Sequence, residues 1–263
     1  MEPELSSARG GALMARFSGK RVIITGAASG MGRASALRIA IEGGTVVCID
    51  IADGGGAGTV AEIERAAGTA FAVQCDVAEP SEVETAIASA HGHLGGIDVL
   101  INCAGTGFYR RFPEVTPDEV NRVMAVNFGG PFWTARYALD ALLQARGSVV
   151  NVVSAAAVRG SAYLTTYSAS KGALLAFTKS LAVEYGPQGL RANAVSPGAV
   201  DTPLLGLFTL PDDADPHLVH RSHGLLGRMS TAEEIAGTIT FLASDDSNHI
   251  TGANVLVDAG STA

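Results

Sequence analysis

The chain has 263 residues, of which 47% are hydrophobic and 17% charged, and its net charge is −8 at neutral pH. This composition is typical of a folded protein with a large core, and it excludes an intrinsically disordered chain. The acidic balance, without a basic stripe, argues against nucleic acid and anionic membranes as partners. The sequence contains no apolar run long enough for a membrane span or a signal peptide, so we expect a cytoplasmic protein.

Short apolar runs alternate with helical patterns along the chain. Residues 1–18 are rich in glycine, serine and alanine and are predicted to form a flexible N-terminal tail. Strands are expected at Arg21–Thr25, Thr45–Asp50, Ala70–Cys75, Ile97–Ile101, Ser148–Val153, Arg191–Val195 and Asn254–Val257. Helices are expected at Met31–Glu42, Ser81–His91, Pro117–Leu143, Thr166–Tyr185 and Ala232–Ser244, with Gly54–Gly58 as a flexible turn.

Several of the expected strands are apolar throughout, which is typical of strands covered by helices on both faces. About seven strands with helical crossovers predict one α/β domain over residues 19–263. Its expected architecture is a Rossmann-type, doubly wound parallel sheet with helices on both faces. Residues 202–228 interrupt the pattern with prolines and acidic residues, which favours a lid over the substrate.

Cysteine and histidine patterns give little support for metal binding. Cys48, Cys75 and Cys103 lie in or directly after apolar runs and lack CxxC spacing, so we expect small buried hydrophobic residues. His217, His220 and His223 recur at every third position. A metal site is one interpretation of that row, but its irregular context favours a row of histidines in a lid or an interface. We therefore predict no metal site.

A glycine-rich turn, Gly26 to Gly32, follows the first expected strand and opens the first helix. Its glycines allow a pyrophosphate to approach the backbone, and the helix N-terminus offers free N–H groups. Asp50 ends the second strand, where a carboxylate can bind ribose hydroxyls and repel a 2′-phosphate. The pattern predicts an NAD(H) site. Arg33 is the one nearby cation, and it could face the solvent or the adenosine.

Tyr167 and Lys171 lie four residues apart, so a helix places both side chains on one face. A nearby ammonium favours the phenolate and is expected to lower the pKa of the tyrosine towards working pH. Such a pair can transfer protons in alcohol and ketone chemistry. Ser154 ends the fifth expected strand, at the binding edge of an open sheet. Asn127 could be an ordinary polar residue on a long helix.

Together these motifs resemble those of the classical short-chain dehydrogenase/reductase family, over essentially the whole chain from about residue 18. The glycine turn matches the family's Thr-Gly-x3-Gly-x-Gly pattern. Asn102–Gly105 matches its Asn-Asn-Ala-Gly, with a cysteine at the second position, and Asp258–Gly260 replaces the usual Asp-Gly-Gly.

The resemblance implies a catalytic tetrad of Asn127, Ser154, Tyr167 and Lys171. In the family, the tyrosine is the general acid/base, the lysine stabilises the phenolate and binds the nicotinamide ribose, and the serine positions the substrate oxygen. Asn127 is expected to anchor a water. The implied cofactor-binding residues are Gly26, Ser29, Gly30, Met31, Gly32, Asp50, Ile51, Asp76, Val77, Asn102, Ala104, Gly105, Tyr167, Lys171, Pro197, Gly198, Val200 and Thr202.

The sequence therefore predicts an NAD(H)-dependent oxidoreductase that interconverts a secondary alcohol and a ketone. The substrate is expected to be a small, fairly apolar molecule, and the resemblance implies a homotetramer. A non-catalytic NAD-sensing regulator on the same fold is an alternative, against which the intact catalytic set argues. A nucleotide-sugar epimerase is a third interpretation, but the sheet pattern continues to Val257 and leaves no room for a separate substrate domain. The expected substrate-binding residues are Ser154, Ala156, Tyr163 and Tyr109, with further apolar lining expected from Phe108, Val158, Leu204, Leu205, Leu207 and Phe208.

Overall fold

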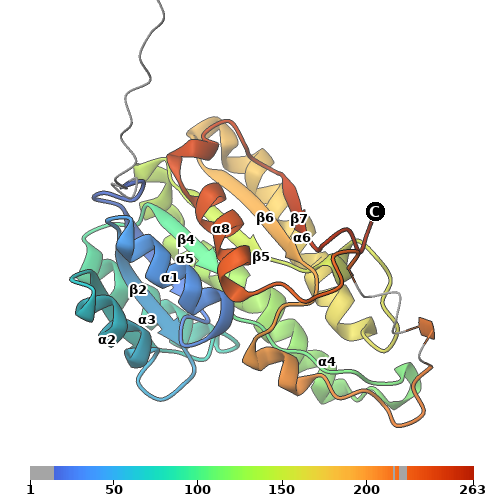
Figure 1. The fold of residues 1–263 in the computed structure, drawn as a ribbon. Helices are drawn as coiled ribbons and strands as arrows, with labels where there is room; N and C mark the ends of the chain where they lie inside the picture. Colours follow the sequence, from blue (N-terminus) through green and yellow to red (C-terminus); the bar gives the residue numbers. More distant parts are fainter. Residues whose placement is uncertain (1–14, 216, 219–223) are drawn as a thin grey trace, which may run out of the picture.

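A seven-stranded parallel sheet forms the centre of the structure (Figure 1), a computed structural model that describes residues 15–215, 217–218 and 224–263. The strand order is β3-β2-β1-β4-β5-β6-β7, with all neighbours parallel. The predicted fold class is therefore confirmed. The strands are β1 (Arg21–Thr25), β2 (Thr45–Asp50), β3 (Thr69–Gln74), β4 (Val99–Asn102), β5 (Ser148–Val152), β6 (Arg191–Pro197) and β7 (Asn254–Val257).

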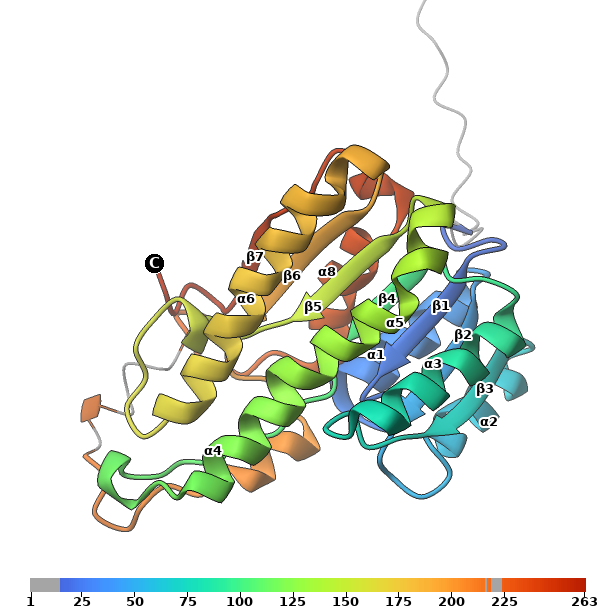
Figure 2. The same ribbon diagram turned by 180° about the vertical axis from the view of Figure 1, so that it is seen from behind.

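Helices cover both faces of the sheet, as the two opposite views in Figures 1 and 2 show. One face carries α1 (Gly30–Ile41), α2 (Ala57–Arg65) and α8 (Ala232–Ala243). The other face carries α3 (Pro80–Leu94), α5 (Gly130–Ala145) and α6 (Thr165–Tyr185). The helix α4 (Pro117–Met124) continues the line of α5 beyond the sheet in Figure 2.

Strand β1 shows why the strands are apolar throughout. Val22 and Ile24 pack into the cluster beneath α1 and α8, whereas Ile23 packs into the cluster beneath α3 and α5. All three side chains are completely buried. Because successive residues of a strand point to opposite faces, a sheet covered on both sides needs an apolar residue at every position. Full burial of each such side chain contributes about 1.5–3 kcal/mol to folding.

The bounds of β1, β2 and β7 agree with the prediction, and those of other elements differ by a few residues. Strand β4 begins at Val99, and the preceding Asp98 accepts hydrogen bonds from the Arg21 backbone N–H and Nε, both at 2.8 Å. Helix α2 was not predicted. Gly54–Gly56 form a turn with positive φ angles, as expected, but Ala57 and Gly58 already belong to α2.

The predicted long helix 117–143 is interrupted at Asn127. A π-helical turn, Ala125–Gly129, separates α4 from α5. Pro131 follows this turn and has no N–H, so the carbonyl of Asn127 loses its regular i+4 donor. Turns of this kind occur frequently at functional sites. The interruption places Asn127, completely buried, beside the loop that follows β4.

The boundary of the predicted N-terminal tail was placed too late. Residues 1–14 lie outside the described residues, but Phe17 is completely buried in the core. Its backbone N–H donates to the Glu42 carbonyl at 3.0 Å, and Arg16 forms an ion pair with the Glu42 carboxylate at 2.6 Å. Residues 16–18 therefore belong to the folded domain, because the end of α1 holds them.

Candidate active site

Two adjoining cavities open at the carboxyl ends of the strands. The larger, about 390 Å³, lies over the ends of β1, β2 and β4. The smaller, about 150 Å³, lies over the ends of β5 and β6, and the two share Met31, Thr202 and Leu204 as walls. The chain reverses direction across the sheet between β1 and β4, and open α/β sheets bind their ligands at such a switch point.

The glycine turn shapes the larger cavity, here named the cofactor groove. A side chain on Gly26 would lie 2.7 Å from the Ala104 backbone nitrogen, and one on Gly32 would lie 2.1 Å from the Gly26 carbonyl oxygen. Only glycine therefore allows β1, α1 and the loop after β4 to approach one another so closely. Ser29, the N-cap of α1, makes no side-chain capping bond, so the first N–H groups of the helix can bind an anion.

Asp50, at the end of β2, lines this groove. One carboxylate oxygen accepts a hydrogen bond from the Ala28 N–H at 2.9 Å, and the other accepts one from the Ala52 N–H at 3.0 Å. Arg33, whose direction the sequence left open, forms an ion pair with Glu62 of α2. The groove therefore has a fixed carboxylate here, and the neighbouring guanidinium is already paired.

Asp76 and Val77 line the groove on the far side of Asp50, together with Arg122 of α4. Arg122 was not predicted, and its guanidinium pairs with the Asp76 carboxylate at 2.8 Å. Burial raises the pKa of Asp76, but hydrogen bonds from Arg122 and the Ala78 N–H outweigh it and hold the pKa below its usual value. No sequence pattern points to Arg122, because only the folded structure brings α4 to this edge of the sheet.

Asn102 was predicted to contact the cofactor, but its side chain lies behind the groove. It is buried, donates to Asn151 Oδ1 at 2.9 Å and accepts from the Thr134 hydroxyl at 2.7 Å. The groove is lined instead by Cys103, Ala104 and Gly105. Burial raises the pKa of the Cys103 thiol to about 12, so this cysteine is a neutral wall residue.

The predicted Ser154 and Tyr167 come together in the smaller cavity, here named the substrate pocket. Burial raises the pKa of Tyr167, while a hydrogen bond with Ser154 lowers it. The expectation that Lys171 lowers the phenol pKa is wrong for this structure, because burial dominates and the ammonium lies 6.0 Å from the ring centroid. The two hydroxyls nevertheless converge on one place where an oxygen atom can be held.

Lys171 and Asn127 lie behind the pocket wall. Burial lowers the pKa of Lys171 to about 8, and its Nζ donates to the Val152 carbonyl at 2.8 Å. The Asn127 amide donates to the Ser170 hydroxyl at 3.0 Å, and its Oδ1 accepts from the Thr106 N–H at 2.9 Å. Asn127 therefore connects the loop after β4 to the helix that carries both Tyr167 and Lys171.

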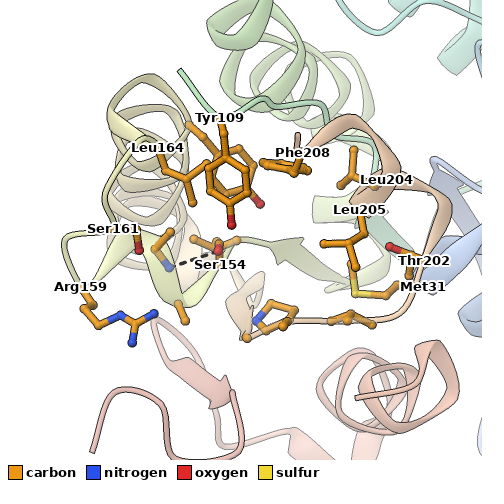
Figure 3. A pocket seen from close by; sticks show the side chains of 18 residues that line it. Met31, Tyr109, Ser154, Arg159, Ser161, Leu164, Thr202, Leu204, Leu205 and Phe208 are labelled. Carbon is orange, nitrogen blue, oxygen red and sulfur yellow. Dashed lines mark hydrogen bonds between the residues drawn. The ribbon is translucent and has the colours of Figure 1, made fainter. Parts of the chain in front are cut away.

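The remaining walls of the substrate pocket come from three loops (Figure 3). Tyr109 follows β4, and the segment after β5 contributes residues that include Ala156, as predicted. Arg159, Ser161 and Leu164 were not predicted and lie at the end of the pocket opposite Thr202 in Figure 3. The end of β6 and the segment after it supply Pro197, Gly198, Ala199, Val200, Thr202, Leu204, Leu205 and Phe208.

Tyr163, predicted to bind substrate, does not line the pocket. Its hydroxyl accepts a hydrogen bond from the Asp215 N–H at 2.9 Å, and its carbonyl accepts one from the Arg110 N–H at 2.9 Å. Arg111 pairs with Asp213 at 2.6 Å. These contacts attach residues 211–215 to the loop after β4. Three more of the predicted lining residues lie outside the substrate pocket: Phe108, Val158 and Leu207, of which Leu207 lines the cofactor groove. Two of the histidines in the predicted row, His220 and His223, lie outside the described residues.

Three further findings concern the described part of the chain alone. Its three cysteines are free, with Cys48 and Cys75 buried as predicted. Within those residues, no group of three acidic, histidine or cysteine side chains could hold a metal ion. Among the helices seen there, none has the length and apolar character that a membrane crossing requires.

A glycine turn at the switch point of a parallel sheet, beside a Ser–Tyr–Lys set, defines an oxidoreductase of the nicotinamide-dinucleotide class. Residues 26–262 match a family model described as "Enoyl-(Acyl carrier protein) reductase". The chain is 39% identical to short-chain reductase protein NovJ of Streptomyces niveus, across 90% of this chain and 92% of that protein. It is 36% identical to meso-2,3-butanediol dehydrogenase of Serratia marcescens, across 94% of this chain and 96% of that protein. The chain therefore belongs to the short-chain dehydrogenase/reductase family.

Solved structures agree with this assignment. A short-chain dehydrogenase from Mycobacterium paratuberculosis bound to NAD superposes with a TM-score of 0.87 at 29% identity, covering 94% of this chain and 99% of that one. A short-chain dehydrogenase from Burkholderia cenocepacia J2315 in complex with NADP gives a TM-score of 0.84 at 30% identity, covering 94% of this chain and 100% of that one. The fold therefore binds a nicotinamide dinucleotide, and the choice between its two forms depends on this chain's own residues.

Proposed function

We propose that the protein interconverts a small secondary alcohol and the corresponding ketone, with NAD(H) as its cofactor. The observation that carries the proposal is the convergence of the Ser154 and Tyr167 hydroxyls in a small pocket that shares walls with the cofactor groove. Two hydroxyls directed at one point hold a single oxygen atom. This favours carbinol and carbonyl chemistry over reduction of a carbon–carbon double bond, the activity that the family model's description names.

The proposed roles follow from the position of each side chain. Ser154 donates a hydrogen bond to the substrate oxygen and fixes the reacting carbon. Tyr167 takes the hydroxyl proton in oxidation and returns it to the oxygen in reduction. Lys171 binds the nicotinamide ribose, and Asn127 holds the loop and helix that flank it. The bound nicotinamide supplies the hydride acceptor or donor.

The preference for NAD(H) is proposed from charge. The Asp50 carboxylate is fixed by two backbone N–H groups where the adenosine ribose would lie. A 2′-phosphate there would meet a like charge, and Arg33 is held by Glu62. Ile51 and Ala52, the next residues, carry no compensating cation.

Substrate size and polarity are proposed from the pocket and from one relative. The walls are mostly apolar and enclose about 150 Å³. The relative named as a dehydrogenase of meso-2,3-butanediol acts on a secondary alcohol of modest size. We extend the proposal to a cytoplasmic homotetramer in which residues 202–228 act as the substrate lid. Size-exclusion chromatography with light scattering tests the assembly.

The variant Tyr167→Phe tests the function. It removes the proton donor and leaves the ring, so turnover of alcohols and ketones should fall by at least about a hundredfold. NADH binding, followed by fluorescence, should remain within about threefold of the wild-type value. Near-normal turnover would contradict the proposed role of Tyr167. A non-catalytic NAD-sensing regulator would instead bind NADH and turn over no member of a panel of secondary alcohols and ketones.

A further inference from the structure

The hydroxyl of Tyr109 is a polar group in the substrate pocket that the proposed chemistry does not use. Tyr109 lies on the loop after β4, its side chain is half-buried, and it lines the pocket. Figure 3 shows its hydroxyl directed towards Ser154. Among the residues that the structure describes, this hydroxyl has no hydrogen-bond partner. Because partly buried tyrosine hydroxyls usually find a partner, a ligand atom is the natural one here.

Packing fixes the direction of this hydroxyl. The Tyr109 ring meets Phe208 edge-on, with ring centroids 5.5 Å apart and planes at 76°. Phe208 meets the Tyr167 ring in the same way, at 5.5 Å and 88°. One lid side chain therefore holds both phenols against the same space. Edge-on aromatic pairs stabilise packing beyond the area that they bury, so the arrangement is not a loose surface contact.

The two phenols also influence each other. Burial raises the pKa of Tyr109, and negative charge on Tyr109 would raise the pKa of Tyr167 further. Tyr109 therefore stays protonated at neutral pH and keeps a proton to donate. Tyr109, Ser154 and Tyr167 line the same pocket, so a ligand held by Ser154 and Tyr167 also meets the Tyr109 hydroxyl.

The size of the pocket limits how far apart these two oxygens can be. Its volume is about 150 Å³, and a cavity of that size is known to hold a benzene ring. Leu164 lies on one side of the pocket and Leu204 and Leu205 lie on the other, so a ring-sized apolar body fits between them. Arg159 and Ser161 lie at the far end, and Arg159 Nη1 donates to the Ser261 carbonyl at 2.8 Å.

We propose that Tyr109 binds a second substrate oxygen on the carbon next to the reacting carbon, so that ring-sized vicinal diols and α-hydroxyketones are the preferred substrates. The proposal depends on the alcohol/ketone function proposed above. In the forward direction, the carbinol C–H passes its hydride to NAD⁺ and the O–H passes its proton to Tyr167 and then to water. The products are the α-hydroxyketone, NADH and one proton. Tyr109 keeps its own proton throughout and acts only by binding.

The test compares Tyr109→Phe with wild type on two substrates that differ by one hydroxyl, cyclohexanol and trans-1,2-cyclohexanediol. The wild-type enzyme should prefer the diol in kcat/KM. Tyr109→Phe should lower kcat/KM for the diol by about tenfold, the value of one lost hydrogen bond, and leave cyclohexanol within about twofold. Tyr137→Phe, a tyrosine on α5 outside the pocket, is the matched control and should change neither value. NADH binding and the melting temperature show that each variant is folded.

Distinct results would overturn the inference. Equal loss on both substrates, with a shifted pH profile of kcat, would mean that Tyr109 acts on Tyr167 and not on a second oxygen. An unchanged diol preference in Tyr109→Phe would mean that its hydroxyl touches no substrate. Either result leaves the proposed alcohol/ketone function standing. Wild-type enzyme that turns over neither alcohol, nor cyclohexanone and 2-hydroxycyclohexanone in reverse, would contradict the proposed function itself.

Discussion

Neutralising Asp50 should shift the cofactor preference towards NADP(H). The substitution Asp50→Asn keeps the shape of the side chain and one of the two oxygens that now accept hydrogen bonds from the Ala28 and Ala52 N–H groups. It removes the negative charge that a 2′-phosphate would meet. The part of the preference for NAD(H) over NADP(H) that depends on this charge should therefore be lost, while the local backbone geometry is largely kept.

The size of the effect follows from the geometry. Two like unit charges about 4 Å apart cost about 4 kcal/mol at an effective dielectric of 20. Asp50 is only partly buried and lines an open groove, so water and salt, with a screening length of about 8 Å, weaken the repulsion. We expect a change of about 2 kcal/mol, which corresponds to about thirtyfold in the ratio of kcat/KM for NADP⁺ to that for NAD⁺.

The assay measures that ratio at two salt concentrations with one alcohol substrate. In the wild-type enzyme the discrimination should shrink as salt is raised, and in Asp50→Asn it should depend little on salt. Glu64→Gln, which removes an exposed carboxylate of α2 away from the groove, is the control for a general charge effect. A ratio that stays unchanged in a folded Asp50→Asn variant would refute the argument that this carboxylate selects the cofactor.

Two further predictions concern the lid and the buried lysine. Tyr163→Phe removes the hydrogen bond that the Asp215 N–H donates to the Tyr163 hydroxyl. The KM for the substrate should therefore rise by about two- to tenfold, while the Kd of NADH stays unchanged. A parallel loss of NADH affinity would contradict a role confined to the lid. Burial lowers the pKa of Lys171 from 10.5 to about 8. Below pH 8 the buried ammonium therefore lowers the free energy of unfolding, and this penalty disappears as the pH rises to 10.5. Lys171→Met should therefore unfold at higher urea than wild type at pH 7, with a difference that narrows above pH 8. A difference constant between pH 7 and 10.5 would mean that burial does not penalise this ammonium.

The sheet and its binding edge could be predicted because both depend on local patterns. Apolar runs such as that around Ile23 identify strands covered on both sides, and parallel pairing then brings every carboxyl end to one edge. Gly26, Asp50 and Ser154 each follow or end a strand, so their meeting at that edge follows from topology alone. Asn102 was placed at the cofactor by the resemblance to the family's Asn-Asn-Ala-Gly motif instead. Its side chain bonds Asn151 of the neighbouring strand behind the groove, and a contact with the cofactor stays a prediction.

The break in the predicted long helix shows where local patterns are insufficient. Residues 117–143 carry a continuous helical pattern, and no residue before Pro131 forbids an α-helix. The π-helical turn is stable because Asn127 finds partners in Thr106 and Ser170, which lie far away in the sequence. Pro131 is a sign in the sequence that this helix is weakened, whereas the distant contacts of Asn127 that stabilise the π-helical turn are visible only in the structure.

The substrate side depends still more on contacts that the sequence does not display. Tyr163 is four residues from Tyr167, yet its φ of 64° turns it out of the pocket to hold the Asp215 backbone. Tyr109 is far away in the sequence, but it does line the pocket as predicted, where Phe208 packs against both Tyr109 and Tyr167. Nearness along the chain is therefore a poor guide to substrate contact in this loop-built pocket. Because Phe208 touches both phenols, substitution of Phe208 should change substrate selection together with turnover.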